Sequence, residues 1–333
     1  MAVESVAYAR AGLMGNPSDG YFGKTISIII RDFSAKVSLY ESPEVEIIPS
    51  FQDRSKYPGI RELVEDVKSN GYYGGIRLMK AAVKKFFDHC QTQGVRLPDR
   101  NFSLRYRSTI PRRLGLAGSS ALVTATVKCL MEFYEVEIPK PLLPNLILSV
   151  EMDELGITAG LQDRVIQVYE GAVYMDFDRD LMEGRGYGEY EELDPALLPP
   201  LFIAYRTDLG EGSETIHNNV RQRWLAGEPD VVQAMKDFAS YAEEARTLLK
   251  AGKGLEIGPL MDKNFARRRS IFNLDPGTVE MVECARNLGA HAKYAGSGGA
   301  VVGMYYDEEM YGRLVHAMGE KGIAVMKPRV EAS

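Results

Sequence analysis

The stretch IPRRLGLAGSSALVTATVKCL, residues 110–130, joins a loop rich in glycine and serine to a long apolar run. Over residues 121–133 apolar side chains fall on nearly every face of a helix, which is typical of a central, buried helix. The first N–H groups of such a helix lack partners, and its dipole leaves partial positive charge there. Gly115 and Gly118 let the backbone approach a ligand closely, which favours a phosphate-binding loop.

A simpler interpretation of this loop is that Ser119 or Ser120 caps the helix, as serines often do. One serine is enough for a cap, and neither Gly115 nor Gly118 is then explained. Both interpretations stay open on this motif alone.

The composition is that of an ordinary globular chain of about two domains. It has 333 residues, of which 45% are hydrophobic and 26% charged, so it can bury a sizeable core. The net charge of -6 argues against a nucleic-acid-binding surface, which needs a basic face. A small positive pocket for a phosphate remains compatible with that charge.

The sequence predicts a cytoplasmic protein without a membrane segment. The N-terminal residues show no secretory signal pattern, and no apolar run approaches the roughly 18 residues of a membrane helix. Cys90, Cys129 and Cys284 are far apart, which favours thiols in a reducing compartment. The four histidines are scattered, so a zinc site is not expected.

The order of elements predicts the α+β class. Strands are expected over 5–15, 24–41, 101–111, 171–178, 290–296, 298–306 and 322–327, and helices over 74–94, 142–156, 161–171, 213–223, 229–250, 256–272, 276–289 and 307–320. This alternation favours an antiparallel sheet covered by helices. Three prolines before a new strand place a domain boundary near residue 195, giving domains 1–195 and 196–333.

A near match to another phosphate-binding motif is rejected. SDGYFGKT, residues 18–25, approaches the pattern G-x-x-x-x-G-K-[ST] but begins with Ser18. The ISIII that follows Thr25 favours a strand, whereas that motif must open a helix.

Two further clusters accompany the opening motif. KYAGSGGAVVGM, residues 293–304, is a second glycine-rich turn between two strand-like segments, and a tight hairpin explains it equally. GLQDRVIQVYEG places Asp163 at the start of an expected helix, with Glu151 twelve residues earlier. Acidic residues in a first helical turn also complement the helix dipole, so each cluster alone is a weak signal.

Taken in order along the chain, ARAGLMGNPSDGYFG, IPRRLGLAGSSA and KYAGSGGAVV resemble the three motifs of the GHMP kinase superfamily, which includes galactokinase, homoserine kinase, mevalonate kinase and phosphomevalonate kinase. GLMGNPSDGYFGKTIS, GYYGGIRL and AGSGGAVV are closest to its plant-type glucuronokinase branch. The resemblance implies a two-domain fold, ribosomal-S5-like and then ferredoxin-like, with the active site between the domains.

The resemblance also implies roles for individual residues. The phosphates of ATP would be held by the backbone of Gly115, Leu116, Ala117, Gly118, Ser119, Ser120 and Ala121. Ser120 and Glu151 would hold Mg²⁺, since this hard cation prefers oxygen ligands. Asp163 would be the base, with Arg10 beside it and the γ-phosphate. The substrate would be bound by Asn16, Asp19, Gly296, Ser297, Gly298 and Gly299.

The chain departs from the family pattern in two places. The loop is one residue longer between Gly115 and Ser119 than in many members, which leaves open which serine meets the metal. Family members that act on neutral hexoses have a glutamate where this chain has Asn16, close to the C6 end of the sugar. Its loss removes a like charge, and such a charge would repel a uronate carboxylate by several kcal/mol. Asn16 is therefore expected to favour a sugar acid.

A carboxylate pocket should also contain an arginine fork. The candidates are Arg31, Arg77, Arg112, Arg113, Arg164 and the run Arg267, Arg268 and Arg269. Charge runs are more often solvated helix faces, and the sequence does not choose among these residues.

The function implied is an Mg²⁺- and ATP-dependent kinase that phosphorylates the anomeric hydroxyl of D-glucuronate and so supplies UDP-glucuronate synthesis. A monomer or homodimer with small-molecule partners only is expected. Alternatives are a related kinase for galacturonate, fucose or a heptose, and a catalytically silent regulator with this fold. A dinucleotide-binding oxidoreductase is excluded, because no acidic residue follows the glycines at the required distance within a βαβ unit.

Overall fold

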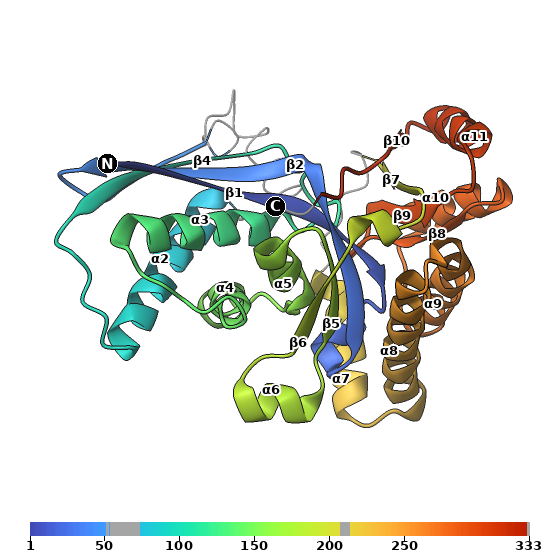
Figure 1. Cartoon of the computed structure of the whole chain (residues 1–333), viewed down its shortest axis with the longest axis horizontal. Coiled ribbons are helices and arrows are strands. Elements are labelled where there is room, and N and C mark those ends of the chain that lie inside the picture. The colour runs from blue at the N-terminus through green and yellow to red at the C-terminus, as the bar shows by residue number, and fades with distance from the viewer. Residues whose placement is uncertain (51–52, 54–73, 207–213, 332–333) are drawn as a thin grey trace.

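The computed structural model describes residues 1–50, Asp53, 74–206 and 214–331, with only the backbone for 214–219. Two sheets organise the described chain, and helices pack against both (Figure 1). The predicted α+β class is confirmed by these mixed elements.

The larger sheet has the strand order β3-β4-β2-β5-β6, with β1 paired to β2. Its strands are β1 (Ala2–Met14), β2 (Lys24–Ser42), β3 (Glu46–Ile48), β4 (Asn101–Ser108), β5 (Ala172–Asp176) and β6 (Glu189–Leu193). All pairings are antiparallel except that of β3 with β4. β2 continues from Lys24 through the Thr25–Ile30 run, so the near match to a phosphate loop is correctly rejected.

The central helix is α3 (Gly118–Tyr134), which packs against β1 and β2. Its residues Ala121, Val123, Ala125 and Val127 are fully buried, as a helix that is apolar on nearly all faces requires. Around it lie α2 (Gly75–Thr92), α4 (Leu143–Ser149) and α5 (Gln162–Tyr169). The end of α3 at the loop is thereby held firmly against the sheet.

The helix expected over 142–156 is divided. α4 ends at Ser149, and a single π-helical turn, η3 (Val150–Glu154), follows it. Such wide turns change the direction in which side chains point and are frequent at functional sites. Here the turn buries Glu151, which is 3% exposed, while the neighbouring Met152 and Asp153 face solvent.

The smaller sheet has the order β10-β7-β9-β8 and is antiparallel throughout. Its strands are β7 (Leu201–Tyr205), β8 (His291–Tyr294), β9 (Ala300–Met304) and β10 (Ala324–Met326). Its helices are α7 (Glu214–Leu225), α8 (Pro229–Lys250), α9 (Gly258–Ile271), α10 (Pro276–Asn287) and α11 (Glu308–Gly319). Residue 213 of the expected helix lies outside the described residues.

Short elements complete the chain: η1 (Ser18–Tyr21), α6 (Arg179–Arg185), η4 (Pro195–Leu197) and η5 (Gly254–Ile257). η4 falls between the last strand of the larger sheet and the first strand of the smaller one. The domain boundary near residue 195 stays a prediction.

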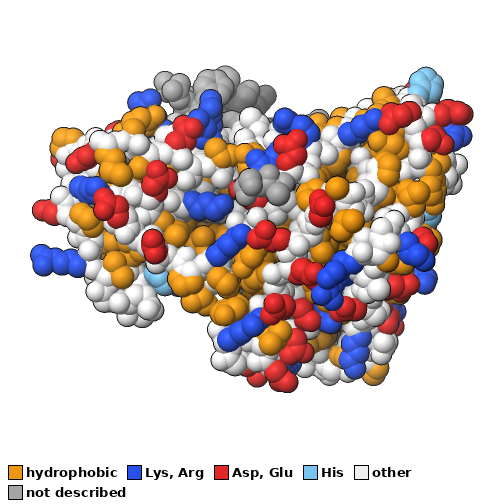
Figure 2. All heavy atoms as spheres, viewed as in Figure 1, with side chains coloured by type: hydrophobic (Ala, Val, Ile, Leu, Met, Phe, Trp, Pro, Cys, Tyr) orange, Lys and Arg blue, Asp and Glu red, His pale blue; other side chains and the backbone are white. Residues whose placement is uncertain are grey.

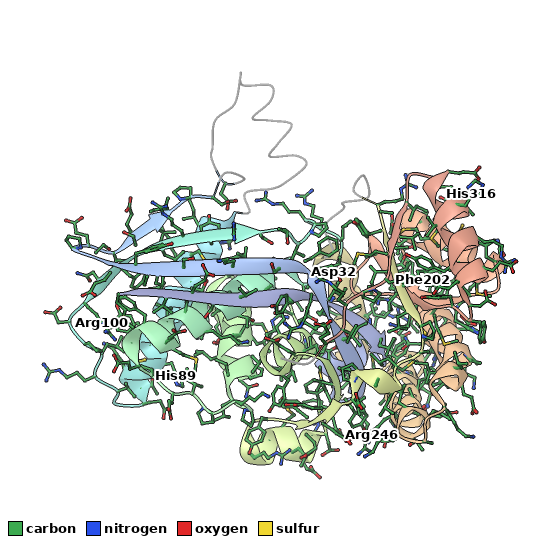
Figure 3. The ribbon with its side chains drawn as sticks, turned by 45° about the horizontal axis from the view of Figure 1, so that its top comes forward. Asp32, His89, Arg100, Phe202, Arg246 and His316 are labelled. Carbon is green, nitrogen blue, oxygen red and sulfur yellow. The ribbon has the colours of Figure 1, made fainter. Side chains whose placement is uncertain are left out.

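One hydrophobic core cluster contains residues of both sheets, and the sheets are tied together at several further points. α8 packs on β2 as well as on α9, so it spans both parts of the molecule. Near the C-terminus Arg329 forms an ion pair at 2.9 Å with Asp32 of β2, at the end of the large sheet nearer to the part that carries Phe202 (Figure 3). The position of one sheet against the other is therefore fixed by packing and by polar contacts.

The surface carries charges of both signs. On the face shown in Figure 2, acidic and basic side chains of the described residues are interspersed. No described helix is long and apolar enough to span a membrane. All three cysteines are free thiols, with Cys90 and Cys129 buried and Cys284 half-buried.

Candidate active site

Arg10 and Asp163 form a two-point ion pair at the centre of the site. Arg10 lies on β1 and Asp163 in the first turn of α5. Nε and Nη2 of Arg10 donate to the two carboxylate oxygens of Asp163 at 2.5 and 2.8 Å. A planar guanidinium that meets a carboxylate in this way fixes both orientations. The Asp163 carboxylate therefore has one defined position at the N-terminus of α5.

The loop before α3 turns its carbonyl groups toward this pair. The carbonyl of Gly115 accepts from Arg10 Nη1 at 2.5 Å, and that of Leu116 accepts from the Arg10 backbone N–H at 3.2 Å. Gln167, one helical turn after Asp163, donates to the carbonyl of Ala117 at 3.0 Å. Because C=O and N–H point in opposite directions within a trans peptide unit, the next N–H groups point away from Arg10 and α5. This arrangement suits a bound anion.

The start of α3 carries no side-chain cap. The capping position is taken by Ala117, in the left-handed region with φ of 62°. Ser119 and Ser120 lie inside the helix, and the Ser120 hydroxyl donates back to the Ala117 carbonyl at 3.1 Å. The capping interpretation is thus wrong, because neither serine occupies the cap position, and no side chain of the described residues caps this helix N-terminus, which suits an anion.

The second glycine-rich stretch, Gly296 to Gly299, is the turn of the β8–β9 hairpin and lies directly against the first. A Cβ at Gly296 would lie 2.0 Å from the Gly115 carbonyl oxygen and 2.8 Å from Arg10 Nη1. Gly299 has φ of 79° and its N–H donates to Thr278 Oγ1 at 2.8 Å. The hairpin interpretation is correct. The turn also packs against the loop that precedes α3, the central helix on the larger sheet.

Glu151 is held on the other side of Asp163 by Arg164. The Arg164 guanidinium donates to Glu151 through Nη2 and to the Gly160 carbonyl through Nη1, and Nη1 lies 3.5 Å from Asp163 Oδ2. Both Glu151 and Arg164 are only 3% exposed. Asp163 therefore lies between two guanidinium groups, Arg10 and Arg164.

These two arginines control the ionisation of the expected base. Burial raises the pKa of Asp163, but the positive charges of Arg10 and Arg164 outweigh burial and hold the pKa below its usual value. The carboxylate is therefore ionised at neutral pH and can accept a proton.

Asn16 follows β1 in the loop that leads to η1, and Asp19 lies in the first turn of η1. Asn16 is 2% exposed and its Oδ1 accepts a hydrogen bond from Lys293 Nζ at 2.5 Å. Asp19 Oδ2 accepts from the Gln162 N–H at 3.3 Å, next to Asp163. Asp19 is thus beside the expected base, whereas Asn16 is directed toward Lys293. The substrate role of each stays a prediction.

Comparisons with known proteins show the family of this chain. The profile of the GHMP kinases N terminal domain matches residues 77–171. Glucuronokinase 1 of Arabidopsis thaliana is 45% identical over 307 residues, covering 90% of this chain and 84% of that protein. The chain belongs to the GHMP kinase family. It is an ATP-dependent phosphotransferase that acts on an alcohol group.

Solved structures show the same fold in other GHMP kinases. The mevalonate kinase of Methanococcus jannaschii superposes with a TM-score of 0.72 at 21% identity and covers 99% of this chain and 98% of its own. Lactococcus lactis galactokinase complexed with galactose gives a TM-score of 0.76 at 15% identity, covering 100% and 94%. The two-domain α+β fold of the family is therefore confirmed for the whole chain.

The protein oxygen ligands in this GHMP kinase are too few to hold Mg²⁺ by themselves, and they suit the cation when a nucleotide supplies further ligands. The described residues contain no group of three or more histidine, cysteine or acidic side chains that could hold a metal ion. Mg²⁺ commonly takes one or two protein carboxylates plus substrate phosphates and water. The Ser120 hydroxyl and the Glu151 carboxylate fit that requirement in kind. Their role as ligands stays a prediction.

Burial also affects Asp19. Burial and the negative charge of Asp163 raise its pKa to about 6, although the Gln162 N–H lowers it. A folded-state pKa above the usual 3.8 means that the folded protein binds more protons than the unfolded chain between these two pH values. Asp19 therefore lowers the stability progressively as pH rises from about 4 to 6, and the loss persists at pH 7.

We expect Asp19→Asn to unfold at a higher urea concentration than wild type at pH 7. The predicted gain in the free energy of unfolding is roughly 1–3 kcal/mol, since about two pKa units correspond to 3 kcal/mol and Asp19 keeps some exposure. Urea unfolding at pH 7 and pH 5 measures it, and the gain should be smaller at pH 5. Asp153→Asn, at an exposed acidic residue, is the control. Equal stability of Asp19→Asn and wild type at pH 7 contradicts the prediction.

Several residues of this site were not predicted from the sequence. Asn264, fully buried on α9, accepts from the Gly15 N–H at 2.8 Å and donates to the Asn16 carbonyl at 3.3 Å. Lys293, 1% exposed on β8, donates to the Gly12 carbonyl and to Asn16. These two side chains hold the substrate-side loop from the second sheet. No local sequence pattern identifies Asn264 or Lys293, since each forms hydrogen bonds with a segment more than 240 residues away in the sequence.

Proposed function

We propose that this protein is an Mg²⁺-dependent sugar kinase that transfers the γ-phosphoryl group of ATP to the anomeric hydroxyl of D-glucuronate. The products are glucuronate 1-phosphate and ADP. The observation that carries the substrate assignment is the 45% identity to Glucuronokinase 1 over 90% of the chain.

The geometry supports a direct transfer in which Asp163 accepts the proton of the attacking hydroxyl. Asp163 is ionised because Arg10 and Arg164 flank it. The Arg10 guanidinium, fixed by Asp163 and the Gly115 carbonyl, would lie beside the γ-phosphate and offset its charge. A positioned base contributes on the order of 10²–10⁴-fold to such a reaction.

The phosphates of ATP would occupy the outward face of the loop over 115–121 and the open N-terminus of α3. The N–H groups there point away from Arg10, and Ala117 leaves the helix without a cap. When bound by Ser120 and Glu151, Mg²⁺ would offset the charge on the phosphates. Glu151 would then exchange its Arg164 contact for the cation, in whole or in part.

The test is ADP release with Mg²⁺-ATP against glucuronate, galacturonate, galactose, glucose and fucose. We expect turnover with glucuronate at a kcat/KM at least about tenfold above that for any other sugar of the panel. Turnover on another sugar of the panel alone overturns the substrate assignment and leaves the kinase activity in place. Binding of ATP without turnover on any sugar favours the silent-regulator alternative.

A further inference from the structure

The structure separates the arginines that could bind a substrate carboxylate. Most already have acidic partners: Arg31 pairs with Glu170, Arg112 with Asp53, Arg164 with Glu151, Arg267 with Asp230 and Asp237, and Arg269 with Glu283. Within the described part of the chain, Arg268 has no acidic partner, although it is only 3% exposed. The middle residue of the arginine run is therefore buried, while its two neighbours form ion pairs nearer the surface.

One edge of the Arg268 guanidinium donates a hydrogen bond, and the other has no hydrogen-bond partner among the described residues. Nη1 donates to the Gly296 carbonyl at 2.9 Å. Nε is buried without a hydrogen-bond partner, and Nη2 has none among the described residues either. The rings of Tyr294 and Phe272 lie 4.9 and 5.3 Å from the guanidinium carbon and hold its plane. The Nε–Nη2 edge is the one that suits a two-point bond to a carboxylate.

A buried guanidinium without an anion is unfavourable for the fold. Burial, together with the positive charge of Arg10, lowers the pKa of Arg268 to about 10, although Tyr294 and Asp19 act in the opposite direction. No acidic side chain of the described residues forms an ion pair with it. Most buried polar groups in proteins have partners, so an unpartnered Nε indicates a site for a bound anion or stored strain.

Arg268 lies next to the candidate active site, on the side of the loop that carries Asn16. Asn264 is one turn earlier on the same face of α9 and holds the loop that carries Asn16. Gly296, whose carbonyl Arg268 binds, also touches Arg10 and Gly115. A single residue thus separates Arg268 from the guanidinium that holds the expected base.

We propose that the Nε–Nη2 edge of Arg268 binds the carboxylate of the sugar acid. The inference rests on the proposed function, because it requires a substrate with an anionic group away from the reacting hydroxyl. A neutral hexose leaves the buried guanidinium unpaired, so Arg268 rejects it as well as attracting the acid. Arg268 would then be the specificity-determining residue that the sequence left undecided among its candidates.

The test compares D-glucuronate with D-glucuronamide, in which a neutral carboxamide of similar size replaces the carboxylate. In wild type, kcat/KM should be much higher for the acid than for the amide. In Arg268→Gln we expect this acid-to-amide ratio to fall about 100-fold, mainly through a higher KM for the acid. Arg268→Lys keeps the charge without the fork and should lose less. Arg269→Gln, which removes an exposed neighbouring arginine, should keep the wild-type ratio.

The outcomes separate this inference from the proposed function. If wild type phosphorylates glucuronate and the acid-to-amide ratio is unchanged in both Arg268→Gln and Arg268→Lys, the proposed role of Arg268 is wrong. The proposed function is then unaffected. If Arg268→Gln does not fold, the ratio in Arg268→Lys decides. Should wild type prefer galacturonate, the proposed substrate is wrong, and the ratio with galacturonate and its amide tests Arg268. A wild type that phosphorylates only neutral sugars overturns both.

Discussion

Asp163→Asn is expected to lower kcat by about 10³-fold, because the amide cannot accept the proton of the attacking hydroxyl. The side chain keeps its size and can still accept one hydrogen bond from Arg10. Binding of ATP should change little, since the loop over 115–121 and the start of α3 remain. ADP release with the accepted sugar, at saturating ATP, measures the effect.

This substitution also leaves the buried Arg10 with a weakened partner, so loss of fold has to be separated from loss of chemistry. Thermal unfolding with and without ATP provides that separation, since a bound ligand stabilises only a folded protein. Asp153→Asn, at a residue paired with Lys85 on the exposed side of η3, is the matched control. A kcat for Asp163→Asn within about tenfold of wild type would show that Asp163 is not the base.

Gly296→Ala is expected to reduce kcat/KM by at least about 100-fold, although alanine is an ordinary residue for a turn. Its Cβ would lie 2.0 Å from the backbone oxygen of Gly115 and 2.8 Å from Arg10 Nη1. A backbone atom cannot move aside as a flexible side chain can, so the two glycine loops must separate. Displacement of catalytic groups by about 1 Å can cost 10²-fold in rate, and overpacking typically costs about 1–3 kcal/mol of stability.

The control for this steric argument is Gly312→Ala. Gly312 is exposed on α11 with nothing near the position of a Cβ, so alanine should keep the activity and favour the helix slightly. Kinetics and urea unfolding of the two variants, measured side by side, test the argument. Wild-type kinetics in Gly296→Ala would mean that the two loops are not in the close contact described.

Local sequence was sufficient where the physical cause is local. The apolar run of α3 predicts a buried helix because nearly every face of it must avoid water, and Ala121 and Val123 to Val127 are buried. The strand-forming residues after Thr25 exclude a phosphate loop there, and β2 runs through them. Gly115 was expected to let the backbone approach a ligand and Gly296 to lie in a tight turn, but the sequence did not show that these two glycines approach each other.

The family motifs implied the roles of Arg10 and Asp163 and that the two lie side by side, and the structure shows the two-point contact between them. The sequence separates these residues by 153 positions, and no period or spacing in it shows that one guanidinium grips both carboxylate oxygens. Glu151 was recognised, but its Arg164 partner and the π-helical turn that buries it were not. The turn packs against α2, and α4 packs against α2 and α5, which are contacts outside the segment itself.

The sequence alone determined the order of elements, the α+β class, the buried central helix and the two glycine loops. These features follow from periodicity and turn residues, which are local properties of the chain. What only the tertiary structure decided is which charges meet. Nothing in the sequence distinguishes the three arginines at 267, 268 and 269. In the structure, α9 directs Arg268 inward beside Gly296, whereas Arg267 and Arg269 have acidic partners nearer the surface. Burial turns one of three equal charges into a group that requires an anion, and burial is a property of the packed fold.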